Sequence, residues 1–290
     1  MASGHALLDV GGGARLERFG ARVTDRPHPA ALGARLDPAA WRTPDLRFDR
    51  DRGWSGDAGI VVAEPWPIDI DGLAMELRAT DAGQVGLFPE HAAMLPWLRE
   101  QVVARGRAGT DDVRAGAEPP AVLHLFAYTG LVTLALAAAG AAVVHLDASR
   151  PTVAWARRNA DTSGLADRPV RWIVDDAVAF TEREVRRGRR YAGIVLDPPS
   201  YGHGPGTGAW RIEDDLPALL AAAGGLLEPD GFILLTAHTA GFEEDRLAAE
   251  IETALRRRSS AIETGPLELS TTDGRTLSLG AFARSAGRAS

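Results

Sequence analysis

Short apolar segments alternate with longer segments of helical periodicity from residue 121 onward. Strands that alternate with helices in this way form a parallel sheet through right-handed crossovers. The pattern predicts five parallel strands, at residues 122–126, 142–146, 170–174, 191–196 and 231–235. Two more predicted strands, at residues 261–267 and 276–283, follow one another without a helix and form an antiparallel hairpin. We therefore expect an α/β fold with a doubly wound, mostly parallel sheet of seven strands.

The helices of this fold are predicted from apolar positions that recur on one face. They are expected at residues 89–101, 131–139, 151–160, 178–187, 216–227 and 243–257. Residues 106–120 are polar, contain Gly and two consecutive prolines, and predict a linker loop.

The first 80 residues follow a different pattern. Residues 14–19, 60–63 and 73–78 alternate between apolar and polar positions, which predicts strands, and residues 53–59 have the composition of a loop. The sequence therefore predicts a small β-rich N-terminal module at residues 1–80 and a larger domain at residues 81–290.

The composition excludes several kinds of chemistry. The 290 residues include no cysteine, which rules out disulfides, thiolate metal sites and a cysteine nucleophile within this sequence. No His, Asp and Glu set has metal-ligand spacing, so no metal site is predicted. The apolar run at residues 131–142 is too short to span a membrane, and residues 1–10 lack the features of a signal peptide. We expect no membrane partner and a cytoplasmic location.

The charge pattern leaves two interpretations open. The net charge is −7, and all 32 basic side chains are arginine, which reflects either the base composition of the genome or phosphate recognition. In the N-terminal module, Arg15, Arg18, Arg22 and Arg26 either contact phosphate or form a solvated face with the interleaved acids.

Candidate ligand-binding residues follow the predicted strands, because such sheets bind ligands outside the carboxyl ends of their strands. The first strand is followed by a turn and a helix start, where Gly130 allows close approach and helical N–H groups favour an anion. This turn consists of Phe126, Ala127, Tyr128, Thr129 and Gly130. After the second strand, Asp147 can accept hydrogen bonds from both hydroxyl groups of a ribose, while Ser149 can cap the next helix.

Two further turns complete the set. After the third strand come Asp175, Asp176 and Ala177, where one aspartate can cap a helix and the other, by preference Asp176, can accept from an adenine amine. The fourth strand is followed by Asp197, Pro198, Pro199, Ser200 and Tyr201. Two prolines fix the backbone and remove two donors, so their carbonyl groups can accept a hydrogen bond from an N–H group of a planar base. Tyr201 can stack on that base.

These four turns resemble the cofactor motifs of the class I S-adenosylmethionine (SAM)-dependent methyltransferases, which have a Rossmann-like fold. More narrowly, they resemble the family of ribosomal RNA large subunit methyltransferase I, as do residues 86–90, which include Phe88. The resemblance implies that residues 126–130 lie along the methionine part of SAM and that Phe88 covers the cofactor. It also implies that Asp147 holds the ribose, that Asp176 meets the adenine amine, and that residues 197–199 face the methyl group.

The resemblance implies an RNA substrate, ribosomal RNA in particular. That family is linked to methylation of cytosine C5, which normally proceeds through a cysteine thiolate. Because this sequence has no cysteine and contains Asp197-Pro198-Pro199, we expect methylation of a base nitrogen instead. A small-molecule N- or O-methyltransferase of the same fold is the alternative.

Other polar residues have simpler interpretations. His124 and His145 are expected to be satisfied core histidines, and Asn159 is expected to brace the turn at Gly164. Residues 202–208, with His203, are expected to form a substrate lid, and His238 is expected near the cleft.

Overall fold

The computed structural model describes residues 4–56, 62–108, 118–203, 209–255 and 261–287. The chain divides into two compact units, which are Met1–Ala92 with Glu268–Leu279 and Ala93–Leu267 with Gly280–Ser290. Parts of five predicted segments lie outside the described residues, namely 57–59, 60–61, 109–117, 204–208 and 256–257.

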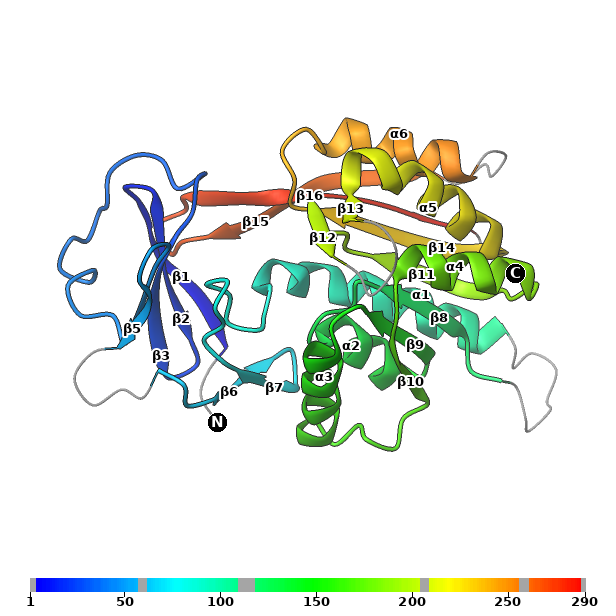
Figure 1. Ribbon diagram of the computed structural model, residues 1–290, viewed down its shortest axis with the longest axis horizontal. Helices are drawn as coiled ribbons and strands as arrows, with labels where there is room; N and C mark the ends of the chain where they lie inside the picture. The colour runs from blue at the N-terminus through cyan, green and yellow to red at the C-terminus, as the bar shows by residue number, and fades with distance from the viewer. Residues whose placement is uncertain (1–3, 57–61, 109–117, 204–208, 256–260, 288–290) are drawn as a thin grey trace. The chain divides into compact units, whose positions relative to one another are not determined.

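The first unit is built on a five-stranded sheet in the order β1-β2-β3-β4-β5, with a separate hairpin of β6 and β7 (Figure 1). Its elements are β1 (His5–Gly11), β2 (Ala14–Phe19), β3 (Arg22–Pro27), β4 (Leu46–Asp49), β5 (Gly53–Gly56), β6 (Trp66–Ile70), β7 (Leu73–Leu77) and most of a 3₁₀ helix, η1 (Pro89–Met94). The predicted β-rich character is confirmed. The described part of the strand expected at residues 60–63 is a turn instead, and β6 begins only at Trp66.

The tip of the last hairpin belongs to this first unit. Leu277 and Leu279 are buried in one apolar cluster with Leu7, Val10 and Ala31. By its contacts, the first unit therefore includes residues that the sequence places near the end of the larger domain. The predicted bounds, residues 1–80 for the N-terminal module and 81–290 for the larger domain, stay a prediction.

A buried ionic cluster lies across β1, β2 and β3. The Glu17 carboxylate has no solvent exposure, accepts hydrogen bonds from Arg26 and from His5 at 3.0 Å, and forms an ion pair with Arg15 at 3.1 Å. Burial by itself raises the pKa of Glu17, but Arg26 and Arg15 outweigh this effect and hold it below its ordinary value. For Arg15 and Arg26 both suggestions are therefore wrong, because these side chains are buried around Glu17. Arg18 is exposed and Arg22 is partly exposed beside Glu64, so both suggestions stay predictions for these two.

The second unit contains the predicted seven-stranded sheet, in the order β10-β9-β8-β11-β14-β16-β15. The parallel strands are β8 (Ala121–Leu125), β9 (Ala142–Asp147), β10 (Val170–Val174), β11 (Tyr191–Leu196) and β14 (Leu227–Ala237). Strands β15 (Ile262–Ser270) and β16 (Thr276–Ala286) follow one another, and β16 pairs antiparallel with β14. The predicted fold class and antiparallel edge are confirmed.

Helices cover both faces of this sheet (Figure 1). On one face lie α1 (Leu95–Ala108), α2 (Leu131–Ala138) and α3 (Arg150–Thr162), and on the other α4 (Ala177–Arg186), α5 (Ile212–Leu226) and α6 (Glu244–Leu255). A short hairpin of β12 (Tyr201–His203) and β13 (Ala209–Arg211) follows β11. Helix α5 begins four residues earlier than expected, with Glu213, Asp214 and Asp215 in its first turn. Acidic side chains at this end stabilise a helix through its dipole.

Two buried histidines share one hydroxyl group beneath the first strand–helix turn. The Oγ1 atom of Thr133 lies 2.7 Å from Nδ1 of His124 and 2.8 Å from Nδ1 of His145. Because a hydroxyl group has a single proton to donate, at least one of the two histidines donates to Thr133 from Nδ1. Burial lowers the pKa of His145 well below its ordinary value, so this side chain is neutral in the fold. The prediction that both histidines belong to the core is confirmed.

We predict that Glu17→Gln destabilises the protein by about 3–5 kcal/mol, because it leaves two buried arginines without a compensating charge. Urea unfolding measures this loss. The matched control is Glu64→Gln, since the Glu64 side chain is 61% exposed and pairs with Arg22 at 3.2 Å. That exposed pair contributes about 0–1 kcal/mol. Equal effects of the two substitutions would show that the buried cluster does not stabilise the sheet.

His145 makes the stability depend on pH. Its pKa in the folded protein is lower than in the unfolded chain, so its contribution is complete above about pH 6.5 and is lost as the pH falls and the unfolded chain binds a proton. We predict that the free energy of unfolding of the wild type falls by about 1 kcal/mol more than that of His145→Gln between about pH 6.5 and 5.5. Parallel pH profiles of the two proteins would contradict a neutral buried His145.

Candidate active site

The turn between β8 and α2 has a strained backbone. Phe126 and Tyr128 have φ angles of 56° and 49°, in the left-handed region that residues other than glycine rarely adopt. Each such residue costs about 1–3 kcal/mol, and the strain persists only where the surroundings impose it. Strain of this kind clusters at ligand sites, which supports the selection of this turn from the sequence.

Three hydrogen bonds hold the turn in place. The backbone N–H of Ala127 donates to the Leu146 carbonyl at 3.0 Å, and the backbone N–H of Tyr128 donates to Oδ2 of Asp147 at 2.9 Å. The buried Asn159 side chain donates to the Thr129 carbonyl at 2.8 Å. Asn159 therefore braces the Thr129 turn, a partner that the sequence did not suggest.

Gly130 occupies the N-cap position of α2 without a side-chain cap, and its φ angle is 94°. A Cβ atom there would lie 3.2 Å from the Cβ atom of Ala156, so both the conformation and the space favour glycine. The N–H groups of the first turn of α2 therefore receive no side-chain acceptor from the N-cap residue. A helix start of this kind attracts a carboxylate or a phosphate.

Asp147 lies at the carboxyl end of β9, beside this turn. Its Oδ2 accepts from the Tyr128 N–H and its Oδ1 from the Ser149 N–H, each at 2.9 Å. A carboxylate oxygen has two lone pairs, so each oxygen can accept one more hydrogen bond, as the two hydroxyl groups of a ribose would donate. Burial raises the pKa of Asp147, while the two backbone hydrogen bonds oppose that rise.

Ser149 has the capping role that was proposed for it. It is the N-cap of α3, and its side chain accepts from the backbone N–H of Thr152. Its predicted contact with the cofactor stays a prediction.

The two aspartates after β10 have different partners. Asp176 is the N-cap of α4, and its Oδ1 accepts from the Ala179 N–H at 2.8 Å. Asp175 forms an ion pair with Arg183, and Ala177 is the buried first residue of α4. Asp176 thus caps α4. Its contact with the adenine amine stays a prediction.

The Asp197 carboxylate is oriented from the neighbouring strand β14. Its Oδ1 accepts from the Thr236 hydroxyl at 2.6 Å, and Nε2 of His238 lies 3.5 Å from the same oxygen. Thr236 and His238 therefore bring the end of β14 into the same site as the end of β11.

The backbone after Asp197 is fixed on several sides. The Trp210 indole donates to the Pro199 carbonyl at 2.6 Å, and the hydroxyl groups of Ser200 and Thr239 lie 2.7 Å apart. The carbonyl group of Pro199 is therefore occupied, contrary to the expectation that both proline carbonyls face a base. The Trp210 ring also packs on Phe126 with 5.1 Å between the ring centroids, which joins this turn to the turn after β8.

Tyr201 is 79% exposed, as a stacking platform for a base must be. His203 lies in the same strand, β12, and most of the expected lid, residues 204–208, lies outside the described residues. Phe88 belongs to the first unit, where its ring lies 5.8 Å from that of His91, and its predicted position over the cofactor stays a prediction.

The sequence interpretation missed the side chains that support the site. Thr236 lies near the end of the fifth parallel strand, β14, and Thr239 follows that strand. Because ligand-binding residues are sought at the carboxyl ends of parallel strands, the same search at this fifth strand would have found both. Trp210 and Asn159 gave no local signal, because their partners are 11 and 30 residues away in the sequence.

No protein-family model matches the chain. The solved structure of a SAM-dependent methyltransferase from Agrobacterium tumefaciens is 33% identical to it, with a TM-score of 0.89, and the match covers 98% of this chain and 90% of that one. The structure of SMU.776, a methyltransferase complexed with SAH, is 17% identical with a TM-score of 0.74 and shows the shared fold.

Curated relatives include ribosomal RNA large subunit methyltransferases. The K/L enzyme of Methylococcus capsulatus is 37% identical over 76% of this chain and 30% of its own length. The K enzyme of Neisseria meningitidis is 31% identical over 44% of this chain and 37% of its own length. The chain thus spans about a third of the length of these relatives, and their names are K/L and K rather than the I of the resemblance.

The described residues contain no helix that is long and apolar enough to cross a membrane. The strained turn, the ribose-type acceptor and the uncapped helix start together fit a SAM-binding edge, and the Agrobacterium tumefaciens enzyme matches nearly the whole chain. The chain belongs to the SAM-dependent methyltransferases.

Proposed function

We propose that this methyltransferase modifies a base of ribosomal RNA at a ring or amino nitrogen. The observation that carries the proposal is the turn at Asp197, Pro198 and Pro199, which is followed by an exposed aromatic ring and held against the cofactor turn by Trp210. The names of the curated relatives support ribosomal RNA as the substrate. A ribosomal RNA substrate would place the protein in the cytoplasm.

The residues at the sheet edge fit SAM by their chemistry. Asp147 offers two acceptor positions for the ribose hydroxyl groups, and the start of α2 offers N–H donors for the methionine carboxylate. Asp176 is the candidate acceptor for the adenine amine. SAM supplies a methyl group that its sulfonium already makes electrophilic, so the protein mainly has to align the acceptor and exclude water.

The acceptor side of the site orients a planar base. In this proposal, Asp197 accepts an N–H of the base, with its carboxylate held by the Thr236 hydroxyl, and the Pro198 carbonyl accepts a second N–H. Tyr201 stacks on the base after the base has left its RNA stack. The absence of cysteine from the sequence favours a nitrogen target, which attacks the methyl group directly with its own lone pair.

The test is methyl transfer from labelled SAM to protein-free ribosomal RNA, followed by mass spectrometry of the nucleosides. The proposal expects a methylated base nitrogen in RNA from the large subunit. Label on cytosine C5 would overturn the choice of atom. Label on small molecules but never on RNA would overturn the choice of substrate and favour the small-molecule alternative.

We predict that Asp147→Ala weakens SAM binding by about 1–3 kcal/mol in calorimetric titration, because it removes a buried partner of the ribose. Asp161→Ala is the control, since Asp161 is an exposed residue of the neighbouring helix α3. NADH should not bind to the wild type, because the turn at residues 126–130 lacks the glycine pattern of dinucleotide sites. If Asp147→Ala bound SAM as tightly as Asp161→Ala, Asp147 would not be the ribose acceptor.

Tyr201→Ala is expected to lower kcat/KM for RNA roughly 5- to 150-fold, the equivalent of about 1–3 kcal/mol of lost base stacking. Tyr201→Phe should keep most of the activity, since the ring remains. Affinity for SAM should be the same in all three proteins. Loss of activity in Tyr201→Phe as well would mean that the hydroxyl group, rather than the ring face, is required.

A further inference from the structure

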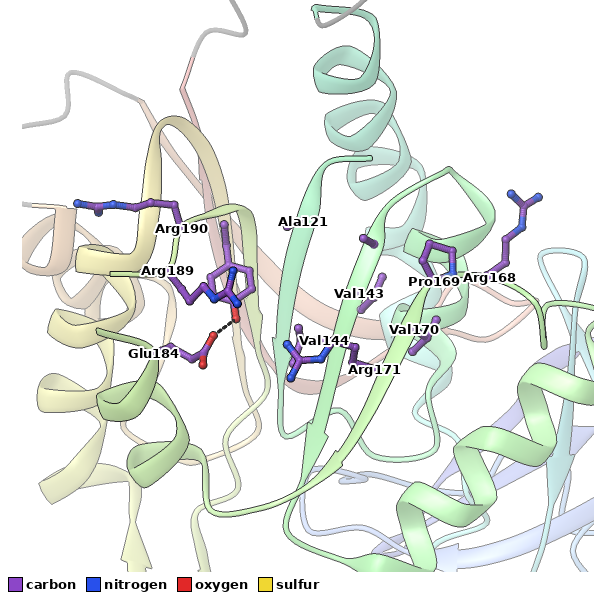
Figure 2. A pocket seen from close by; sticks show the side chains of 12 residues that line it. Ala121, Val143, Val144, Arg168, Pro169, Val170, Arg171, Glu184, Arg189 and Arg190 are labelled. Carbon is purple, nitrogen blue, oxygen red and sulfur yellow. Dashed lines mark hydrogen bonds between the residues drawn. The ribbon is translucent and has the colours of Figure 1, made fainter. Parts of the chain in front are cut away.

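A cavity of about 380 Å³ opens at the edge of the sheet where the parallel strands begin (Figure 2). The first residues of four strands line it, namely Ala121, Ala142, Val170 and Tyr191. The same strands carry the cofactor turns at their other ends. Strands of five or six residues rise about 3.3 Å per residue, so the two edges are roughly 16–20 Å apart. The cavity is therefore a second site, separate from the site of methyl transfer.

Small apolar residues line this cavity together with four arginines, namely Arg168, Arg171, Arg189 and Arg190. Figure 2 shows Arg171 and Arg189 extending toward one another, whereas Arg168 points away from them. Burial raises the pKa of Tyr191 at the start of β11, and the positive charges of Arg171 and Arg189 oppose that rise. Arg190 donates to the Gly225 carbonyl, so Arg171 and Arg189 are the guanidinium groups left to face a ligand.

The carboxylate of the cavity, Glu184, interacts electrostatically with Arg171 but makes no hydrogen bond to either arginine. Glu184 is buried, accepts from the Tyr191 hydroxyl at 2.6 Å and pairs with Arg187 at 2.9 Å. Within the described part of the chain, no hydrogen bond or ion pair joins the side chain of Arg171 or Arg189 to another residue.

Three other arginines of this unit pair with carboxylates. Arg246 pairs with Glu250 at 2.7 Å, Arg186 pairs with Glu182 at 3.8 Å, and Arg183 pairs with Asp175. Arg171 and Arg189 converge without a hydrogen-bonded carboxylate among the described residues, in a chain with a net charge of −7. Their planar forks match phosphate oxygens, which they can bind through two parallel hydrogen bonds.

We propose that this cavity binds backbone phosphate of the RNA substrate, at the sheet edge opposite to the site of methyl transfer. The inference rests on the proposed RNA function. A separation of about 16–20 Å corresponds to roughly five or six base pairs at ~3.4 Å each, so one structured RNA reaches both edges. Phosphate contacts of this kind fix the register of the RNA and leave the choice of base to the other edge.

The experiment measures the affinity of a fluorescently labelled RNA hairpin at a series of salt concentrations. It compares the wild type, the double variant Arg171→Ala/Arg189→Ala and the control Arg186→Ala/Arg246→Ala, which removes two arginines that have carboxylate partners. Each phosphate contact contributes about 0.7–0.9 to the slope of log affinity against log salt. We expect the slope of the double variant to fall by about 1.4–1.8, with at least a tenfold weaker affinity at low salt. The control should bind RNA as the wild type does.

SAM titration of all three proteins separates loss of the site from loss of the fold, because the SAM affinity should not change. If the wild type binds RNA and the double variant equals the control, the phosphate site is wrong and the proposed RNA function stands. If the wild type binds SAM but no RNA, both proposals fail.

A final arm distinguishes RNA from a free phosphate compound as the source of the phosphate. AMP and inorganic phosphate, at matched ionic strength, are tested for thermal stabilisation of the wild type and the double variant. Stabilisation of the wild type alone, with equal RNA affinity of both proteins, would overturn the assignment to RNA and identify a site for small phosphate compounds.

Discussion

The hydrogen bond from the Tyr128 backbone N–H to Asp147 is the contact on which the active edge depends. It ties the end of β8 to the end of β9 and holds two non-glycine residues, Phe126 and Tyr128, in the left-handed region. The same carboxylate keeps acceptor positions for a ribose. The strain of the turn is thus offset by the group that, in our proposal, also binds the cofactor.

The acceptor side is coupled to this turn by packing. Trp210 contacts Phe126 with its ring and holds the Pro199 carbonyl with its indole N–H, while Thr236 orients Asp197 from the neighbouring strand. A change in the position of one turn therefore shifts the other. Methyl transfer needs the donor and the acceptor in line, and a rigid link between the two turns provides that alignment. The cavity at the opposite edge adds, in our proposal, a distant phosphate contact that fixes where the RNA lies.

The sequence predicted the second unit well, because in a parallel α/β sheet each strand is a short apolar run and each ligand-binding residue follows a strand. Strands β10 and β11 coincide with their predicted ranges, and Asp147 and Asp197 lie at strand ends as expected. In the first unit, β2 and β7 match predicted strands, but the buried charges were not foreseen. Its buried Glu17 and Arg26 appear as surface residues in a hydrophobicity pattern, and only the fold shows that they neutralise one another. Trp210 and Asn159 were missed for a related reason, since long-range contacts leave no periodic signal.

A crystal structure of the protein with S-adenosylhomocysteine, the product of SAM after methyl transfer, would test this account most directly. The account predicts the ligand at the carboxyl edge of the sheet, with both ribose hydroxyl groups about 2.6–3.2 Å from the Asp147 carboxylate. It also predicts the ligand carboxylate at the start of α2. A ligand bound at another edge, or a ribose out of hydrogen-bonding reach of Asp147, would contradict it.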